Sequence, residues 1–330
     1  YAIINAAIII LLYTGAIELD DGTLSNGNVV ALYNYMSQIL VELIKLANLI
    51  ITVTKSFACA GRLSEVLSMK SSLVRGSSER HEDMPFICFD NVCMKYSPDA
   101  GYALSGVSFT AQRGETIGII GGTGSGKTTL VNLIPHFYDA SLGGVYVDGV
   151  NVNGYTDEDI RSKCGIVPQR AVLFKGTIAE NIRWGKEDAT DEEVMQAIDA
   201  AQASDVVKSK RKGLDEMVEQ GGLNFSGGQR QRLTIARALV KRPEILILDD
   251  SASALDYATD AALRRSIKNL DYKPTVFIVS QRTSSIRNAD KIIVLEHGEV
   301  AGIGTHEELL KNCELYREIH YSQYEKKEEA

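Results

Sequence analysis

The sequence lacks the cysteine and histidine spacings by which metal sites and disulfide frameworks are recognised. Its five cysteines include no C-x-x-C pair, and its five histidines have no partners at metal-ligand spacing. We therefore expect reduced thiols in a cytosolic setting and histidines that are structural or solvated. The cysteines are Cys59, Cys88, Cys93, Cys164 and Cys313, and the histidines are His81, His136, His297, His306 and His320.

The chain also lacks an excess of positive charge, an initiator methionine and any apparent internal repeat. Its formal net charge is −8, which argues against nucleic acid as a partner. It begins at Tyr1 inside an apolar run, so we expect a piece of a longer polypeptide, for which no signal peptide can be assessed. Its 330 residues favour about two domains, and 45% hydrophobic with 24% charged residues is ordinary for a globular protein.

Two apolar segments occupy the N-terminal part of the chain. Residues 1–17 contain almost no polar side chains, residues 18–28 are polar and turn-rich, and a second apolar segment covers 29–53. Seventeen helical residues span about 25 Å, close to the thickness of a hydrocarbon core. Both segments are predicted to be transmembrane helices, and the second is predicted to continue as a more polar cytosolic helix to residue 69.

The second segment carries a polar stripe at helical spacing, formed by Asn34, Gln38, Glu42, Lys45, Asn48 and Thr52. In a membrane the stripe would line a bundle interior or a translocation path, with Glu42 and Lys45 partly neutralising each other. The alternative is an amphipathic helix on a soluble domain. Lys55 and Arg62 follow the segment while no Lys or Arg precedes Lys45, which predicts a cytosolic C-terminal side and an external loop at 18–28.

A polar linker at 70–85 separates the predicted end of a membrane domain (1–69) from a second domain (86–330). In that domain short apolar strands alternate with helices, which predicts an α/β fold with a mainly parallel sheet covered by helices. Strands are expected at 86–92, 107–111, 116–120, 144–147, 164–167, 245–248, 275–279 and 291–296. Helices are expected at 127–136, 157–162, 177–183, 191–201, 227–240, 257–269 and 305–311.

A glycine-rich loop lies between the strand at 116–120 and the next helix. It reads Gly121-Gly122-Thr123-Gly124-Ser125-Gly126-Lys127-Thr128-Thr129, which is the P-loop pattern. Its glycines let backbone N–H groups surround a phosphate chain, and the following helix N-terminus favours anions. Lys127 is expected to reach the β- and γ-phosphates of a bound phosphate chain and Thr128 to ligate Mg²⁺; the alternative is a plain glycine-rich turn before a helix.

Two further motifs lie downstream. Four aliphatic residues, 245–248, run into Asp249 and Asp250, as in a buried strand that delivers an aspartate beside a P-loop. Asp249 is expected to hold Mg²⁺ directly or through water, and the alternative is a solvated turn.

Ser226 and Gln229 have capping-box spacing ahead of a long amphipathic helix. Gly227 and Gly228 leave N–H groups open to an anion, although by spacing alone this is equally a well-capped helix.

These motifs together resemble those of ABC transporters. Phe225-Ser226-Gly227-Gly228-Gln229 resembles the LSGGQ signature, and the P-loop, signature and Asp249 strand follow the family's order and rough spacing. The other resemblances are Val167-Pro168-Gln169 to the Q-loop, Ser253-Ala254-Leu255-Asp256 to the D-loop, Met94-Lys95-Tyr96 to the A-loop, and Gly304-Thr305-His306-Glu307-Glu308-Leu309 to the end of exporter-type ATPase domains. The N-terminal segments resemble the last two transmembrane helices of an exporter half-transporter, truncated upstream.

The resemblance covers essentially the whole chain and implies a P-loop NTPase domain with a RecA-like core and a helical subdomain. It implies that ATP is held between one chain's P-loop and the partner's signature. It further implies that Tyr96 stacks on adenine, and that Gln169 contacts Mg²⁺ and the attacking water and relays the nucleotide state to the membrane helices. The signature residues, Ser226, Gly227, Gly228 and Gln229, would complete the partner's site, and Asp256 would lie between the two sites.

The implied partners are a second half-transporter, membrane lipid and a transported small molecule, lipid or peptide. The implied location is the cell membrane, with the ATP-binding domain in the cytosol. The sequence does not name the cargo.

Two positions depart from the family pattern. Asp250 stands where a glutamate usually orients the attacking water; its carboxylate would retreat by about 1.5 Å, and misplacement of about 1 Å can cost on the order of 10²-fold in rate. Gln281 replaces the switch histidine and can donate a hydrogen bond to a γ-phosphate oxygen but cannot become cationic.

The combination resembles the less active subunit of heterodimeric exporters. The chain's own site, with Asp250, Gln281 and Gln169 as its catalytic residues, is therefore expected to turn ATP over slowly because of Asp250 and Gln281, while a partner with Glu and His at those positions does most of the hydrolysis. Two competing interpretations are a soluble P-loop ATPase without transport and a regulatory subunit without turnover.

Overall fold

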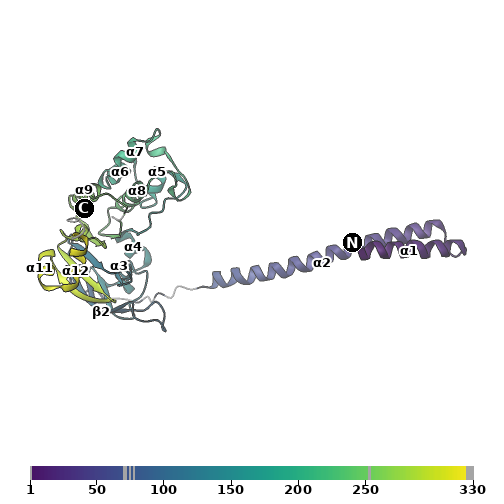
Figure 1. The fold of residues 1–330 in the computed structure, drawn as a ribbon, viewed down its shortest axis with the longest axis horizontal. Helices are drawn as coiled ribbons and strands as arrows, with labels where there is room; N and C mark the ends of the chain where they lie inside the picture. The colour runs from purple at the N-terminus through teal and green to yellow at the C-terminus, as the bar shows by residue number, and fades with distance from the viewer. Residues whose placement is uncertain (1, 70–72, 74–75, 77–78, 252–253, 325–330) are drawn as a thin grey trace. The chain divides into compact units, whose positions relative to one another are not determined.

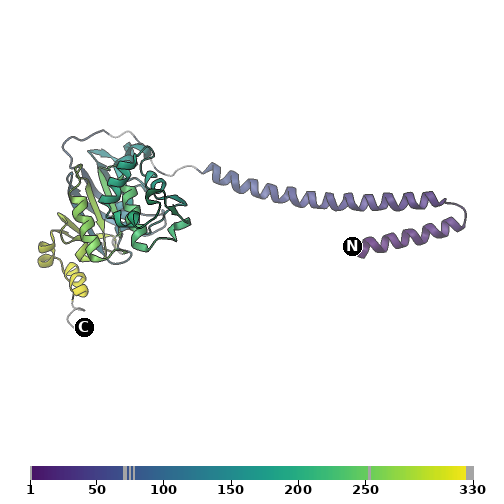
Figure 2. The ribbon, with the colours of Figure 1, turned by 90° about the horizontal axis from the view of Figure 1, so that it is seen from above.

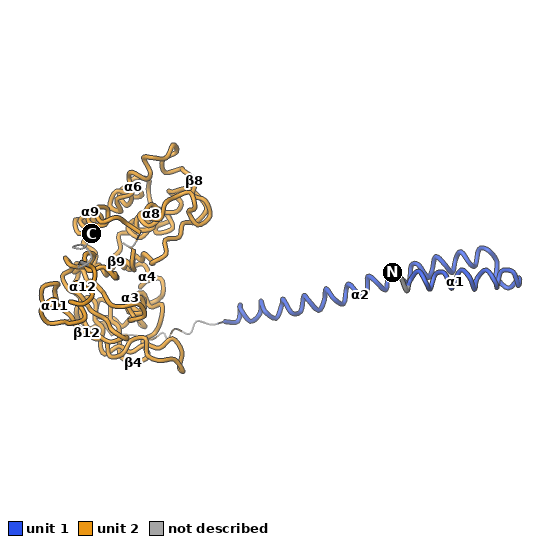
Figure 3. Tube along the Cα trace, in the orientation of Figure 1, with its two compact units in different colours: residues 1–72 blue, residues 73–330 orange. Residues whose placement is uncertain are grey.

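The computed structural model describes residues 2–69, 73, 76, 79–251 and 254–324. The chain divides into two compact units, residues 1–72 and 73–330 (Figure 3). The predicted linker at 70–85 falls partly outside the described residues, and the boundaries 1–69 and 86–330 stay predictions.

Unit 1 is a helical hairpin made of α1 (Ala2–Asp20) and α2 (Asn26–Ser68) (Figure 2). Gly15 allows the two helices to approach, since a Cβ there would lie 3.2 Å from a methyl group of Val29. Ser25 caps α2 by accepting a hydrogen bond from the backbone N–H of Asn28.

Helix α2 runs unbroken over 43 residues, as predicted for a second helix that continues beyond residue 53. At 1.5 Å per residue it is about 65 Å long, roughly twice the thickness of a hydrocarbon core. Within the described part of the chain, α2 is one helix that length and composition alone would allow to cross a membrane. Glu42 and Lys45 form the expected ion pair, at 2.7 Å, on an exposed face.

A six-stranded sheet forms the centre of unit 2, in the order β12-β11-β3-β10-β9-β6. All neighbours pair in parallel except β11 and β12, so the predicted α/β fold with a mainly parallel sheet is confirmed. The strands are β3 (Thr116–Gly121), β6 (Cys164–Val167), β9 (Ile245–Asp249), β10 (Thr275–Val279), β11 (Lys291–Glu296) and β12 (Glu299–Gly304).

Alternate residues of these strands face two separate hydrophobic cores. In β10, Val276 and Ile278 join one core while Phe277 and Val279 join the other, because successive strand side chains point to opposite faces. A strand buried on both faces must be apolar throughout, which explains the continuous aliphatic runs in the sequence.

The first core packs the sheet against helices. Figure 1 shows α5 to α9 grouped at one end of unit 2 and α11, α12 and β2 at the other. The helices of this core are α5 (Ile178–Arg183), α6 (Asp191–Ala200), α7 (Ser204–Lys208), α8 (Gly227–Leu239), α9 (Tyr257–Lys268), α10 (Thr283–Ile286), α11 (His306–Asn312) and α12 (Glu314–Tyr324). Capping boxes begin α5, α6, α8 and α11.

The second core lies between the central sheet, α3 (Lys127–Leu133), α4 (Asp157–Lys163) and an antiparallel sheet of order β2-β1-β4-β5. The strands of that sheet are β1 (Ile87–Met94), β2 (Leu104–Ala111), β4 (Leu142–Val147) and β5 (Val150–Asn151). Short 3₁₀ turns occur at Val152–Gly154, Gly213–Asp215 and Gln220–Gly222, and β7 (Gly176–Thr177) pairs with β8 (Met217–Val218).

Several local predictions were wrong. The antiparallel sheet was not expected, because alternation along a chain does not show how strands pair. Helix α3 ends at Leu133, not at 136, and β5, β7, β8, β12, α7, α10 and α12 were missed because they are short or lack a clear apolar period. Helix α12 continues to Tyr324 and packs on α10 and α11; residues 325–330 lie outside the described part.

Candidate functional site

The predicted motifs converge at the carboxyl edge of the central sheet. Val279 at the end of β10 is in register with Ile119 of β3 and Asp249 of β9, and Leu248 is in register with Val167 of β6. The P-loop, the Asp249-Asp250 pair, Gln169 and Gln281 each follow one of these strands. Parallel sheets of this kind bind ligands at this edge.

The backbone of the P-loop requires glycine. Gly126, with φ of 95°, lies at the start of α3, and a Cβ there would lie 2.7 Å from the carbonyl oxygen of Ala103. At Gly121 a Cβ would lie 2.1 Å from the carbonyl oxygen of Leu295. The loop is thus pressed against its neighbours and leaves its backbone as the surface available to a phosphate chain.

Lys127 is buried within this loop. Its Nζ donates hydrogen bonds to the carbonyl oxygens of Gly121 (2.9 Å) and Gly122 (2.6 Å), and lies 3.4 Å from Ser125 Oγ. Burial lowers the pKa of Lys127, and the nearby carboxylates of Asp250 and Asp249 oppose this shift. The Lys127 ammonium therefore lies against the loop backbone, where the phosphates of a nucleotide would need a cation.

The hydroxyl of Thr128 donates to both carboxylate oxygens of Asp249, at 3.2 and 3.0 Å. Burial raises the pKa of Asp249, as does the charge of Asp250, while the hydrogen bond from Thr128 lowers it. A hydroxyl and a carboxylate held together are the hard oxygen ligands that Mg²⁺ prefers, so these two residues fit the predicted metal.

Gln169 and Asp250 lie together. The Gln169 side chain donates from Nε2 to Asp250 Oδ2 at 3.3 Å. The backbone of Asp250 has φ of 45°, a left-handed conformation that Asp adopts more readily than most residues, and its N–H donates to the carbonyl of Val279. Burial raises the pKa of Asp250, while the hydrogen bond from Gln169 and the charges of Arg282 and Lys127 lower it.

Gln281 follows β10 with an exposed side chain. Its backbone carbonyl accepts a hydrogen bond from Gln323 Nε2 at 2.7 Å. Its position in the chain was anticipated, but the contact with α12 was not, since that helix was not predicted.

Tyr96 reaches the P-loop from the end of β1. Its hydroxyl hydrogen-bonds with Thr129 Oγ1 at 2.8 Å, and the residue as a whole is 55% exposed. The Tyr138 ring meets it edge-on, with centroids 5.1 Å apart and planes at 88°. Sequence reasoning missed Tyr138, for which no motif gave a signal.

The signature segment belongs to the helical part of unit 2, where α8 packs on α5 and α6. The predicted capping box is confirmed: Ser226 Oγ accepts from Gln229 N (3.3 Å) and Gln229 Oε1 accepts from Ser226 N (3.0 Å). Gly228 lies against residue 254, since a Cβ on it would lie 3.0 Å from the carbonyl oxygen of Ala254.

Asp256 caps α9. Its carboxylate accepts from the backbone N–H and the hydroxyl of Thr259, both at 2.8 Å, and the pKa of Asp256 is lowered chiefly by the backbone bond. Ser253, the first residue of the D-loop match, lies outside the described residues.

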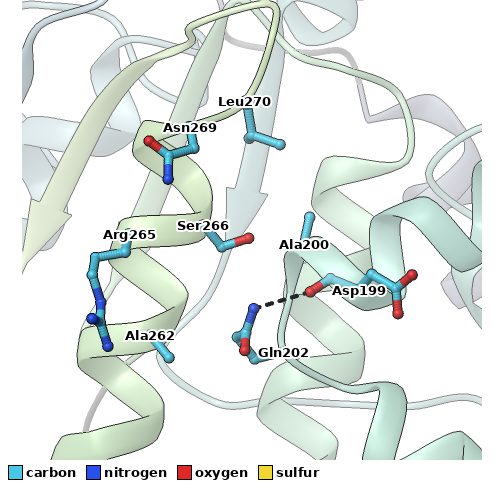
Figure 4. Close-up of a pocket in the computed structure, with 8 residues that line it drawn as sticks. All are labelled: Asp199, Ala200, Gln202, Ala262, Arg265, Ser266, Asn269 and Leu270. Carbon is cyan, nitrogen blue, oxygen red and sulfur yellow. Dashed lines mark hydrogen bonds between the residues drawn. The ribbon is translucent and has the colours of Figure 1, made fainter.

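A separate hollow of about 530 Å³ lies between α6 and α9 (Figure 4). Its rim includes Asp199, Gln202, Arg265 and Asn269, and Gln202 Nε2 donates to the carbonyl oxygen of Asp199 at 3.2 Å. The hollow is lined by none of the predicted site residues, so we assign it no part in nucleotide binding.

Comparison with known proteins decides what this arrangement belongs to. Residues 104–253, which include the P-loop, the signature and the Asp249 strand, match the ABC transporter family. The chain carries an ABC transporter ATP-binding domain. The resemblance inferred from the motifs is thereby confirmed.

Relatives extend the similarity to the whole chain. An uncharacterized ABC transporter ATP-binding protein of Bacillus subtilis (strain 168) is 40% identical over 322 residues, which cover 98% of this chain and 56% of that protein. An ATP-dependent lipid A-core flippase of Pasteurella multocida (strain Pm70) is 33% identical over 323 residues, covering 97% and 56%. The chain is therefore homologous to ABC exporter half-transporters and spans about half the length of these relatives.

A solved structure agrees with this assignment. The structure of a bacterial Atm1-family ABC exporter with ATP bound matches this chain with a TM-score of 0.76 and 30% identity. The match covers 98% of this chain and 57% of that one, so the ABC transporter fold extends over both units.

Proposed function

We propose that this chain is the ATP-binding subunit of an ABC exporter whose own ATP site binds Mg-ATP and hydrolyses it slowly. The observation that carries the proposal is the cluster of Lys127, Thr128 and Asp249 at the carboxyl edge of the sheet, with Asp250 as the next residue. Family membership supports ATP hydrolysis as the activity of the assembly, and the half-transporter relatives support work as a dimer with a partner.

In this proposal the loop amides and Lys127 bind the β- and γ-phosphates, and Thr128 and Asp249 hold Mg²⁺, with Gln169 beside them. When bound, Mg²⁺ neutralises charge that develops on the phosphate oxygens. Tyr96 stacks on the base, for which its half-exposed ring is suitably placed beside the loop.

Slow hydrolysis follows from two side chains. Asp250 would orient and polarise the attacking water, but its carboxylate is one methylene short of the usual glutamate, and Gln281 offers a neutral donor where a histidine could be charged. The Ser226–Gln229 signature would complete the ATP site of a partner half-transporter, and Asp256 would lie between the sites. We propose a heterodimer in which the partner's P-loop performs most of the hydrolysis.

The test is a steady-state ATPase assay of the chain alone and together with its partner. We expect low turnover alone, higher turnover in the pair, and a gain of on the order of 10-fold or more at this chain's site in the double variant Asp250→Glu, Gln281→His. Rapid turnover by the chain alone that Asp250→Asn abolishes would overturn slow hydrolysis. No turnover in the pair would favour a regulatory subunit instead.

The cargo is proposed only by class: a small molecule, lipid or peptide. The relatives named as lipid A-core flippases favour an amphiphile that reaches the transporter from the membrane. A complex that remains soluble without detergent would overturn the membrane assignment and favour a soluble ATPase.

A further inference from the structure

The side-chain amide of Gln323 hydrogen-bonds to the backbone on both sides of Arg282. Gln323 Nε2 donates to the carbonyl oxygen of Gln281 at 2.7 Å. Gln323 Oε1 accepts from the backbone N–H of Thr283 at 2.9 Å and from the Thr283 hydroxyl at 3.2 Å. One amide group on α12 thus satisfies a carbonyl and an N–H that lie two residues apart, as a neighbouring strand would.

This contact takes the place of a missing helix cap. Helix α10 is a single turn, and its N-cap residue, Arg282, supplies no side-chain hydrogen bond to the first turn. Unsatisfied N–H groups at a helix start are costly when buried, and Thr283 is fully buried. Gln323 provides the acceptor from a helix about 40 residues later in the chain.

The backbone just before Gln281 is held by the central sheet. The N–H of Ser280 donates to the carbonyl of Ile119 in β3, just before the P-loop. The backbone from Ser280 to Thr283 is therefore fixed by the nucleotide-bearing strand at one end and by α12 at the other. The Gln281 side chain is exposed and can therefore face a ligand.

A second residue of α12 also contacts Thr283. His320 Nδ1 lies 3.1 Å from Thr283 Oγ1. With the Thr283 hydroxyl donating its one hydrogen to Gln323 Oε1, the Nδ1-protonated tautomer of His320 is the one that donates to Thr283. In that arrangement the hydrogen bonds run from His320 Nδ1–H to the Thr283 hydroxyl and from that hydroxyl to Gln323 Oε1. The Gln323 amide is then oriented with its nitrogen toward the Gln281 carbonyl.

We propose that Gln323 is a positioning residue for Gln281, so that α12 sets the direction in which residue 281 meets the γ-phosphate. The inference rests on the proposed function, because it gives Gln281 a role at the ATP site. Without the amide, the Gln281–Thr283 backbone would lose its contact with α12 while its contact with β3 remained. Displacement of a catalytic group by about 1 Å is enough to change the rate on the order of 10²-fold.

The experiment uses the full chain in its assembled transporter, both as wild type and with Asp250→Glu and Gln281→His so that its own site contributes to turnover. Gln323→Ala removes both contacts, whereas Gln323→Glu keeps an acceptor for Thr283 but cannot donate to Gln281 when ionised. Ser322→Ala, on the exposed face of α12, is the matched control. The measurements are amide hydrogen exchange of Thr283 and its neighbours, kcat and KM for MgATP, and Tm.

We expect Gln323→Ala to accelerate exchange of the Thr283 amide about 10-fold, the equivalent of one lost hydrogen bond. We expect kcat in the activated background to fall on the order of 10-fold with KM nearly unchanged. Gln323→Glu should leave Thr283 protected and still lower kcat, and Ser322→Ala should change neither.

Unaltered amide exchange in Gln323→Ala would show that Gln323 does not hold the Thr283 backbone. Faster exchange with unaltered kcat, or an equal loss in Gln323→Ala and Ser322→Ala, would show a purely structural role and overturn the positioning. Failure of the wild-type chain to bind MgATP would overturn the proposed function, while hydrogen exchange would still report whether Gln323 holds the segment.

Discussion

At the scale of single residues, the candidate site concentrates buried charge. Lys127, Asp249 and Asp250 are each partly or largely removed from water. Burial lowers the pKa of Lys127 and raises the pKa values of Asp249 and Asp250, so in each case it favours the neutral form. Such groups lower the stability of the fold and are retained where a ligand needs them. The site is thus tuned for binding a polyanion and a divalent cation, at a cost to the stability of the domain.

Replacement of Asp249 should expose this cost. An acid whose pKa is raised by folding loses stability as pH rises from its unfolded pKa through its folded pKa. Asp249→Asn should therefore raise Tm at neutral pH by about 1–3 °C, and the difference should vanish below the ordinary pKa of aspartate. Thermal unfolding as a function of pH measures it, and a lower Tm at neutral pH would contradict it.

Tyr138 should matter through Tyr96. An edge-on aromatic contact contributes about 0.5–1.5 kcal/mol, so Tyr138→Ala should weaken ATP binding about 2- to 10-fold. Tyr138→Phe keeps the ring and should bind ATP as the wild type does. Equilibrium nucleotide titrations of both variants decide the point, and equal affinities for Ala and wild type would remove Tyr138 from the site.

At the scale of elements, the sequence predicted the loops, helix caps and strands that depend on residues close together in the chain. The P-loop backbone, the capping box of α8 and the apolar strands β3 and β9 arise from residues that are neighbours in the chain, and they lie where expected. The missed elements depend on distant partners. Among the described side chains of α12, Tyr316 is fully buried, and the helix is held by α10 and α11, which its own sequence does not indicate.

The capping box of α8 should have a stability role and a separate role in hydrolysis. Ser226→Ala and Thr190→Ala each remove the cap of one helix, α8 and α6, and each should cost about 1 kcal/mol. Only Ser226→Ala should also lower ATP turnover in the assembled transporter, because Ser226 is proposed to contact the partner's nucleotide. Similar turnover in the two variants would show that Ser226 acts only as the N-cap of α8.

At the scale of the whole molecule, the two units differ in how far their apolar side chains are buried within the chain. In unit 2 the aliphatic strands are buried, whereas the described side chains of α2 include none that is buried within the chain. A 43-residue helix that exposes Leu, Ile and Val requires either lipid or other helices around it. The half-transporter relatives are longer than this chain and support the second helix as part of a membrane domain.

The orientation of α2 can be tested by labelling. In a variant that retains Cys59 as the single cysteine, a membrane-impermeant maleimide should react from the cytosolic side, because Lys55 and Arg62 flank Cys59. A cysteine introduced as Thr23→Cys, in the exposed turn between α1 and α2, should react from the outside. Reaction of both from the same side would contradict the predicted topology.

The motifs in the chain were enough to predict the class of the fold, which is confirmed, and to propose which residues form the site. Glycine spacing, cap residues and apolar strands act through contacts within a few residues, so their consequences can be read along the chain. The pairing of Tyr96 with Tyr138, the antiparallel sheet and the grip of Gln323 on Gln281 were decided only by the tertiary structure. Each joins segments about 40 residues or more apart, or depends on strand pairing, and such contacts form only when both cores close around the central sheet.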